Sequence, residues 1–86
     1  MWKTTSKNQV ITENQNLQPD GYSQLLLKNI GDCDCTVNDN IPLPAGDTFS
    51  WENDAGIVID ETTFVRFVGD GLVKKVLVVK TYFRKE

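Results

Sequence analysis

The chain has 86 residues and a formal net charge of −3, so we expect a single domain with a small core. The acidic balance argues against nucleic acid as the main partner, and no apolar run reaches the roughly 18–20 residues that span a bilayer. The first seven residues contain no apolar signal region, so we expect no signal peptide, synthesis in the cytoplasm and reduced cysteines.

Residues 1–20 are polar and rich in Asn, Gln and Thr, and the turn Pro19-Asp20-Gly21 closes them. We expect an extended N-terminal arm with one short strand at Gln9–Thr12, outside a β-sandwich domain of residues 21–86. A segment this polar cannot fold alone. We therefore predict that the arm adds to a sheet edge or groove of a neighbouring subunit. Its expected partner contacts are the large apolar side chains Trp2, Val10, Ile11 and Leu17.

The middle of the chain predicts several short strands separated by turn residues. The first is apolar on both faces at Leu25, Leu26 and Leu27. A later segment contains two prolines, which cannot donate to a β-ladder, so it should run along an edge. In order, the predicted strands and extended segments are Tyr22–Ile30, Cys33–Asn38, Ile41–Pro44, Thr48–Glu52 and Ile57–Ile59, with a turn at Asn53–Gly56 before the last.

The last third holds Gly69-Asp70-Gly71 between two runs rich in β-branched and aromatic residues, residues 62–68 and 72–83. This pattern predicts a β-hairpin. Its register stays open between a type I′ turn at Asp70-Gly71 and a type II′ turn at Gly69-Asp70. In the second run Val76–Val79 is apolar at every position, so we expect both faces of this strand to be covered.

About seven short strands, with turns every 8–12 residues and no helical periodicity, indicate an all-β fold. We predict a small antiparallel β-sandwich or jelly roll with an extended N-terminal arm.

No residue pattern indicates catalysis, a cofactor or a metal site, and we expect the protein not to be an enzyme. The sequence has no histidine, which is the commonest general base and metal ligand. Cys33 and Cys35 are too few for a zinc site and are expected to be buried, reduced thiols. Three aspartates could surround a calcium ion, but they lack the EF-hand spacing and are expected to be solvated loop residues: Asp32, Asp34 and Asp39.

Two features leave alternatives open. Phe49 and Trp51 share one strand face and could be core residues or a platform for sugar stacking, and we favour the core for at least one of them. From Asn29 to Val65 the chain has eight acidic residues and no Lys or Arg, and most of the basic residues follow. This asymmetry indicates either acidic loops beside a basic strand surface, or copies that associate head to tail, acidic edge to basic edge.

Four segments together resemble small all-β virion proteins of tailed bacteriophages: Leu26–Gly31, Cys35–Asn38, Ile41–Phe49 and Thr62–Phe67. The resemblance covers about residues 22–80 and consists of strands, an Asn-x-Gly turn and a Leu-Pro-x-Gly turn. It implies a capsid decoration, head-fibre or tail accessory subunit, located in the virion, that forms a homo-oligomer and binds its own copies or a capsid protein. That class has no shared active site, so no residue role is transferred.

The sequence thus supports two hypotheses. The first is a structural assembly subunit that docks through its N-terminal arm. The second is a carbohydrate- or receptor-binding β-sandwich module, which a shallow cleft exposing Trp51 and Tyr22 would favour.

Overall fold

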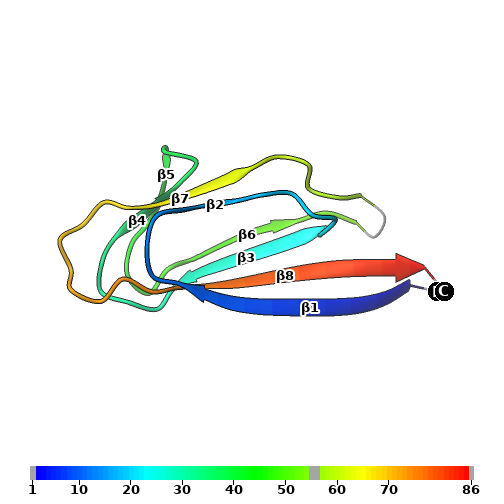
Figure 1. Ribbon diagram of the computed structural model, residues 1–86, viewed down its shortest axis with the longest axis horizontal. Helices are drawn as coiled ribbons and strands as arrows, with labels where there is room; N and C mark the ends of the chain where they lie inside the picture. The colour runs from blue at the N-terminus through cyan, green and yellow to red at the C-terminus, as the bar shows by residue number, and fades with distance from the viewer. Residues whose placement is uncertain (1, 55–56, 86) are drawn as a thin grey trace.

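The computed structural model describes residues 2–54 and 57–85, and this part of the chain contains eight β-strands (Figure 1). No helix that could cross a membrane occurs among these residues. The strands are β1 (Trp2–Ile11), β2 (Gln15–Leu17), β3 (Gln24–Asn29), β4 (Cys35–Val37), β5 (Ile41–Leu43), β6 (Thr48–Glu52), β7 (Thr63–Phe67) and β8 (Val76–Lys85).

The chain folds as one long antiparallel ribbon that is rolled up on itself. In the ribbon β1 pairs with β8, β2 with β7, β3 with β6 and β4 with β5. Rolling brings β8 beside β3 and β7 beside β4. Two four-stranded sheets result, ordered β1-β8-β3-β6 and β2-β7-β4-β5. This is the strand order of a jelly roll, which confirms the predicted all-β fold class.

The core lies between the two sheets and is built from alternate residues of their strands. From the first sheet, Leu27 and Val78 are fully buried, and from the second, Val37 and Val65 are fully buried. Phe49 and Trp51 on β6 are partly buried and pack against this cluster, which confirms their assignment to the core.

The predicted hairpin around Gly69-Asp70-Gly71 is wrong, because β7 and β8 belong to different sheets. The segment 68–75 crosses between the sheets at one end of the molecule (left in Figure 1). Neither glycine has a positive φ. A Cβ at Gly69 would lie 2.9 Å from the backbone nitrogen of Asp34, and one at Gly71 would collide with the carbonyl of Asp32. The glycines therefore permit close packing of two crossing segments, 30–34 and 68–75.

The predicted arm is also corrected, since β1 and β2 are strands of the domain itself. The strand expected at Gln9–Thr12 is the end of a ten-residue strand that pairs with β8 over its whole length. The long β8 offers an open edge within the same chain, and its ladder satisfies the backbone groups of β1 that face it. The edge that we expected from a neighbouring subunit is therefore supplied by β8.

The segment Ile57–Ile59, predicted as a strand, has none. Ile59 is buried and its backbone N–H donates to the carbonyl of Tyr22 (2.8 Å), whereas Ile57 and Val58 are exposed. The turn predicted at Asn53–Gly56 falls partly on residues 55–56, which lie outside the described residues.

Candidate interaction surface

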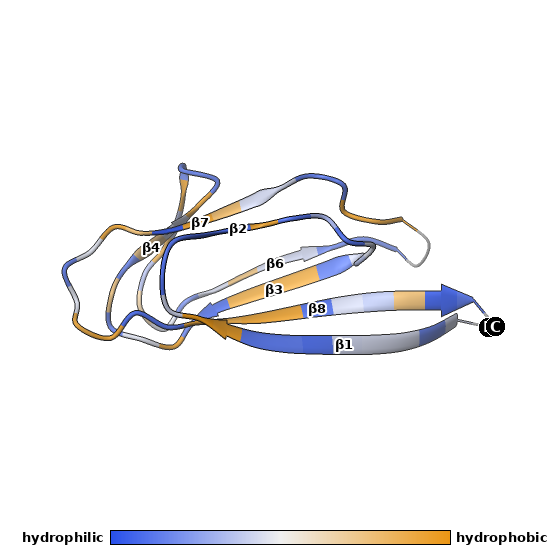
Figure 2. Cartoon of the chain, viewed as in Figure 1, coloured by the Kyte–Doolittle hydropathy of each residue, from blue (hydrophilic) through white to orange (hydrophobic). Residues whose placement is uncertain are grey.

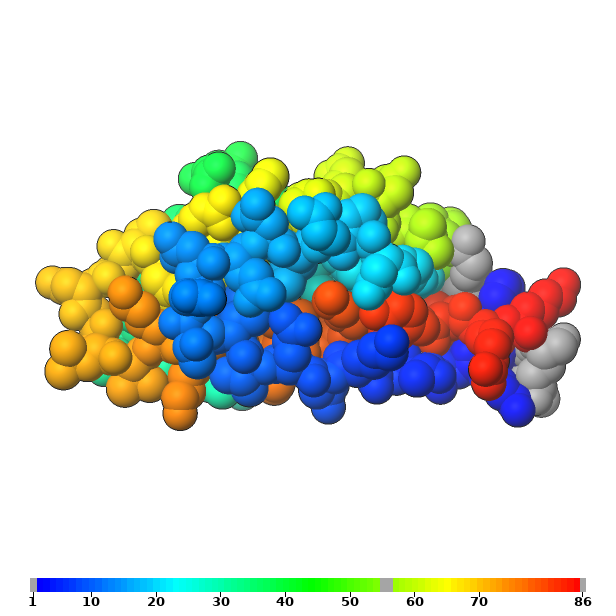
Figure 3. All heavy atoms as spheres, in the orientation of Figure 1, coloured from blue at the N-terminus to red at the C-terminus, as the bar shows by residue number. Residues whose placement is uncertain are grey.

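The most exposed regular element is β1. It is an edge strand with β8 on one side only, and every residue from Trp2 to Val10 is exposed. In Figure 3 it runs along the lower rim of the molecule. Ten residues of strand extend over about 33 Å. The backbone groups of β1 that point away from β8 have no strand beside them in the sheet, and such an edge is a template for pairing with another chain.

The two ends of the β1–β8 pair differ in what lies on their inner face, the face toward the second sheet. At one end Ile11, Val76 and Val78 are buried in the core. At the other end, residues 2–7 and 80–85 contain no buried residue, and we call this part the projecting ribbon. Figure 2 shows hydrophobic colour where β1 ends and β8 begins, and pale or hydrophilic colour along most of the rest of β1. Tyr82 packs against the core, and the ladder holds the projecting ribbon along its length.

The projecting ribbon is strongly basic. β1 and β8 together contain no Asp or Glu. The pairing register places Lys3 opposite Arg84 and Lys7 opposite Lys80, on the inner face. The cations of the ribbon are Lys3, Lys7, Lys80, Arg84 and Lys85.

Two tyrosines, Tyr22 and Tyr82, contact lysines of the projecting ribbon. Their rings meet edge to face at 6.2 Å. The Lys7 Nζ lies 5.1 Å from the ring centroid of Tyr82, and the Lys80 Nζ lies 5.2 Å from that of Tyr22. The Tyr82 hydroxyl donates to Asp20 Oδ1 at 2.9 Å. These ring contacts hold the two lysine ammonium groups over aromatic faces.

Both phenols stay protonated near neutral pH. Burial raises the pKa of Tyr82 to about 12, and the hydrogen bond to Asp20, the charge of Asp20 and the neighbouring Tyr22 act in the same direction. Burial and then the Asp20 charge raise the pKa of Tyr22, while the Thr63 hydroxyl lowers it. The tyrosines therefore add no negative charge to the ribbon.

The outer face of the same sheet carries a half-exposed apolar strip. Val76 and Val78 are buried, but Leu77 and Val79 are only partly buried, so the prediction that both faces of this strand are fully covered is wrong. Their outer-face neighbours in the ladders are Val10, which faces Leu77 from β1, and Leu26, which faces Val79 from β3. No third layer covers this strip within residues 2–54 and 57–85, since the fold has two sheets.

The structure divides the predicted partner contacts into two pairs. Trp2 and Val10 lie on the outer face of β1, 45% and 51% exposed, and are available to a partner. Ile11 and Leu17 are 3% and 2% exposed in the protein's own core, so their assignment as partner contacts is wrong. They are the anchors of β1 and β2, because burying one such side chain stabilises the fold by roughly 1.5–3 kcal/mol.

Sequence reasoning missed Lys3 and Lys7 as surface residues of the edge. The signal was present: every residue from Lys3 to Gln9 is charged or polar, as in a strand solvated on both faces.

The crossing segments at the opposite end hold the two thiols. Cys33 and Cys35 are both buried and carry free thiols. The Cys33 Sγ donates to the carbonyl of Gly69 at 3.2 Å. Burial, and to a smaller extent the neighbouring Cys33 and Asp34, raise the pKa of Cys35 to about 11. A buried thiol with a raised pKa is a poor nucleophile at neutral pH.

The side chain of Asn29, the last residue of β3, connects the segment 30–34 to β5. Its side chain is fully buried, and its Nδ2 donates to the carbonyls of Cys33 (2.7 Å) and Leu43 (3.0 Å). Its Oδ1 accepts from the Gly31 N–H at 3.1 Å. One amide thus satisfies three backbone groups, two in the segment 30–34 and one in β5.

Two of the three aspartates considered for calcium accept hydrogen bonds from the backbone. The Asp32 Oδ1 accepts from the Val73 N–H at 2.7 Å, and the Asp34 Oδ1 accepts from the Ala45 N–H at 3.2 Å. Among the described residues, no three Asp, Glu, Cys or His side chains gather as a metal site would require.

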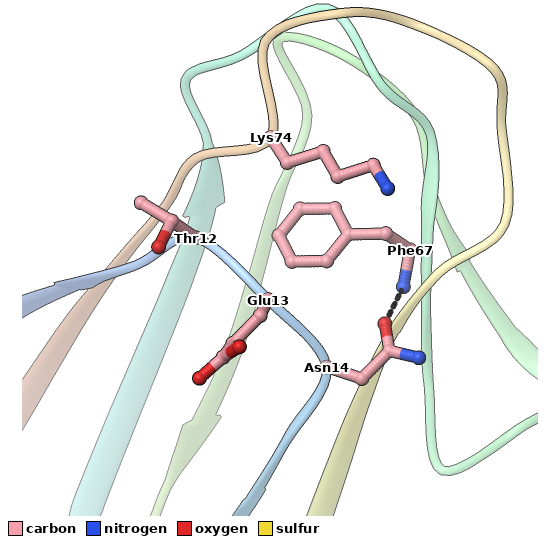
Figure 4. Close-up of a pocket in the computed structure, with 5 residues that line it drawn as sticks. All are labelled: Thr12, Glu13, Asn14, Phe67 and Lys74. Atoms are coloured by element: carbon pink, nitrogen blue, oxygen red, sulfur yellow. Dashed lines mark hydrogen bonds between the residues drawn. The ribbon is translucent and has the colours of Figure 1, made fainter.

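A hollow of about 360 Å³ lies where the β1–β2 connection meets the end of β7 (Figure 4). Glu13 and Lys74 lie on opposite sides of the Phe67 ring, with Thr12 nearby, and the Phe67 N–H donates to the Asn14 Oδ1 at 2.8 Å. One carboxylate and one ammonium beside a ring can hold a side chain by charge and stacking, but this lining contains no nucleophile paired with a base.

The cleft that would favour sugar binding is not formed by the residues named for it. Tyr22 is fully buried, and Trp51 is partly buried against the core. Comparison with known proteins finds no matching family model, no matching curated protein and no matching solved structure.

Proposed function

We propose that this chain is a non-enzymatic structural subunit that assembles through the free edge of β1. The observation that carries the proposal is a ten-residue edge strand, exposed along residues 2–10 and without proline. Soluble proteins usually shorten, cover or interrupt such an edge, because it invites pairing. An open edge of this length fits a protein in which another chain pairs with the edge when the protein functions.

The outer face supports the same conclusion. Trp2 and Val10 expose large apolar side chains on β1, and Val10 continues the strip formed by Leu77 and Val79. Exposed apolar residues grouped on one face are typical of interaction sites. The proposed subunit is of the virion type that the chain resembles, and its partners are its own copies or a capsid protein. The jelly roll is also found in viral capsid proteins, an argument by fold analogy only.

The test is the mass of the protein in solution over a concentration series, by sedimentation velocity. We expect the chain to exceed its monomer mass of 9.7 kDa. Replacing Trp2 and Val10 by Ser should weaken association by about tenfold, as loss of two apolar contacts does. The matched control replaces Ile57 and Val58, which are equally exposed but lie away from β1, by Ser. A chain that stays monomeric at every concentration contradicts the proposal.

A further inference from the structure

The two edges of the first sheet carry opposite charge. β1, at one edge, contains Lys3 and Lys7 and no acidic residue. β6, at the other edge, contains Glu52 and follows Asp47, and it lies within the stretch from Asn29 to Val65 that has no Lys or Arg. The first sheet therefore has a basic strand at one edge and an acidic strand at the other.

These two edges are also suited to pairing by their length and direction. The edges of the second sheet are β2 and β5, each three residues long, and β5 contains Pro42. β6 has five residues and no proline. Neighbours in the first sheet are all antiparallel, and three such steps lead from β1 to β6, so these strands run in opposite directions.

A second copy in the same orientation, placed beside β1, would thus present its β6 antiparallel to β1. We propose that β1 of one copy pairs with β6 of the next, so that the first sheets of successive copies join head to tail. This inference rests on the proposed function and names the partner as a second copy of the chain. Pairing continues the antiparallel order of the sheet and brings the basic edge against the acidic edge.

The charges also disfavour the alternative in which β1 pairs with β1 of another copy. That arrangement would bring two basic ribbons side by side, each with Lys3 and Lys7 on β1 and Lys80 and Arg84 on β8. Like charges placed together across an interface are a common device against the wrong partner. Head-to-tail contacts form a ring if the rotation between successive copies brings the last copy back to the first. Otherwise they form an open filament.

The test uses two charge-reversed variants of the full chain. The first carries Lys3→Glu and Lys7→Glu on β1, and the second carries Asp47→Lys and Glu52→Lys at β6. Each variant alone has two edges of the same sign, so we expect its association to fall by about tenfold or more at low salt. In an equimolar mixture every β1 again meets a β6 of opposite sign, so association should return.

Two controls change the same charge elsewhere: Lys74→Glu with Lys75→Glu, and Glu61→Lys with Asp70→Lys, all at exposed loop positions. Both should associate like the unaltered chain. If the β6 variant alone associates normally while the β1 variant does not, the inference is overturned and assembly through β1 stands. If the mixture fails to recover, head-to-tail pairing is wrong. A monomeric unaltered chain overturns both this inference and the proposed function.

Discussion

The two halves of the β1–β8 pair are made by the same ladder, but they differ in how much apolar side chain they bury between the sheets. The half of the pair that contains the start of β8 is the near half, and there Val76 and Val78 point into the space between the sheets. In the projecting ribbon the same inner face carries Lys7, Lys80 and Tyr82. The near half is fixed by burial of apolar surface, which dominates folding free energy. The projecting ribbon has its hydrogen bonds, its ring contacts and the packing of Tyr82 against the core, and the outer edge of β1 stays open.

The largest difference between the two halves is expected when one charge is placed on the inner face of each. Val78→Asp puts a carboxylate in the core without a partner, which costs several kcal/mol and is comparable to the whole stability of a small domain. We expect no soluble folded protein. Thr5→Asp, on the same face of the projecting ribbon, should change the free energy of unfolding by less than about 1 kcal/mol. Soluble yield and far-ultraviolet circular dichroism measure both, and equal effects would contradict the division.

Asn29→Ala should produce the next largest effect. It leaves the buried carbonyls of Cys33 and Leu43 without their donor, which costs about 2–4 kcal/mol in the free energy of unfolding. Urea denaturation measures the loss. The control is Asn8→Ala, an exposed position of β1 that should alter stability by less than about 0.5 kcal/mol. An Asn29→Ala protein as stable as its parent would show that water replaces the amide.

Gly71→Ala tests the close approach of the two crossing segments. The added methyl group meets the backbone carbonyl of Asp32, so one segment must shift, and we expect a loss of about 1–3 kcal/mol. Asp70→Ala, an adjacent exposed position, is the control and should be neutral. If Gly71→Ala is neutral too, the segment 68–75 packs more loosely than the structure shows.

The smallest effect concerns Tyr82 and depends on pH. Its pKa is about 12 in the folded protein against 10.0 for an ordinary tyrosine, so the folded state favours the protonated phenol. This stabilisation is complete below pH about 10 and is lost as the pH rises from about 10 through 12. Cys35, at about 11 against 9.0, loses its contribution from about pH 9 to 11.

Tyr82→Phe should cost about 0.5–1.5 kcal/mol at neutral pH, because the hydrogen bond to Asp20 is lost. The variant should also show a smaller fall in unfolding free energy between pH 10 and 12 than the parent. Urea denaturation at a series of pH values measures both. Parallel stability curves for the two proteins would mean that Tyr82 ionises as it does in the unfolded chain.

The local residue pattern predicted the positions of strands well where apolar residues alternate. The segment Thr48–Glu52 was predicted with the bounds that β6 has, and Tyr22–Ile30 contains β3. The pattern failed for β1, where only Gln9–Thr12 was predicted. A polar strand has no apolar period of its own, and it forms because β8 offers a ladder beside it. For the candidate surface, the sequence pattern predicted Trp2, Val10, Ile11 and Leu17 alike as partner contacts, and it could not show that Ile11 and Leu17 lie in the protein's own core.

Residue patterns alone were enough to predict an all-β chain and the place of most of its strands, and the uneven distribution of charge is visible in the sequence. These properties follow from period-two alternation and turn residues, which act locally. The partners of each strand could be read only from the tertiary structure. Glycines at 69 and 71 fit a tight hairpin or a close crossing equally well, and the rolled ribbon selects the crossing because it buries Val65 and Val76 from opposite sheets. The same rolling places β1 and β6 at opposite edges, because strand order depends on contacts between residues far apart in the chain.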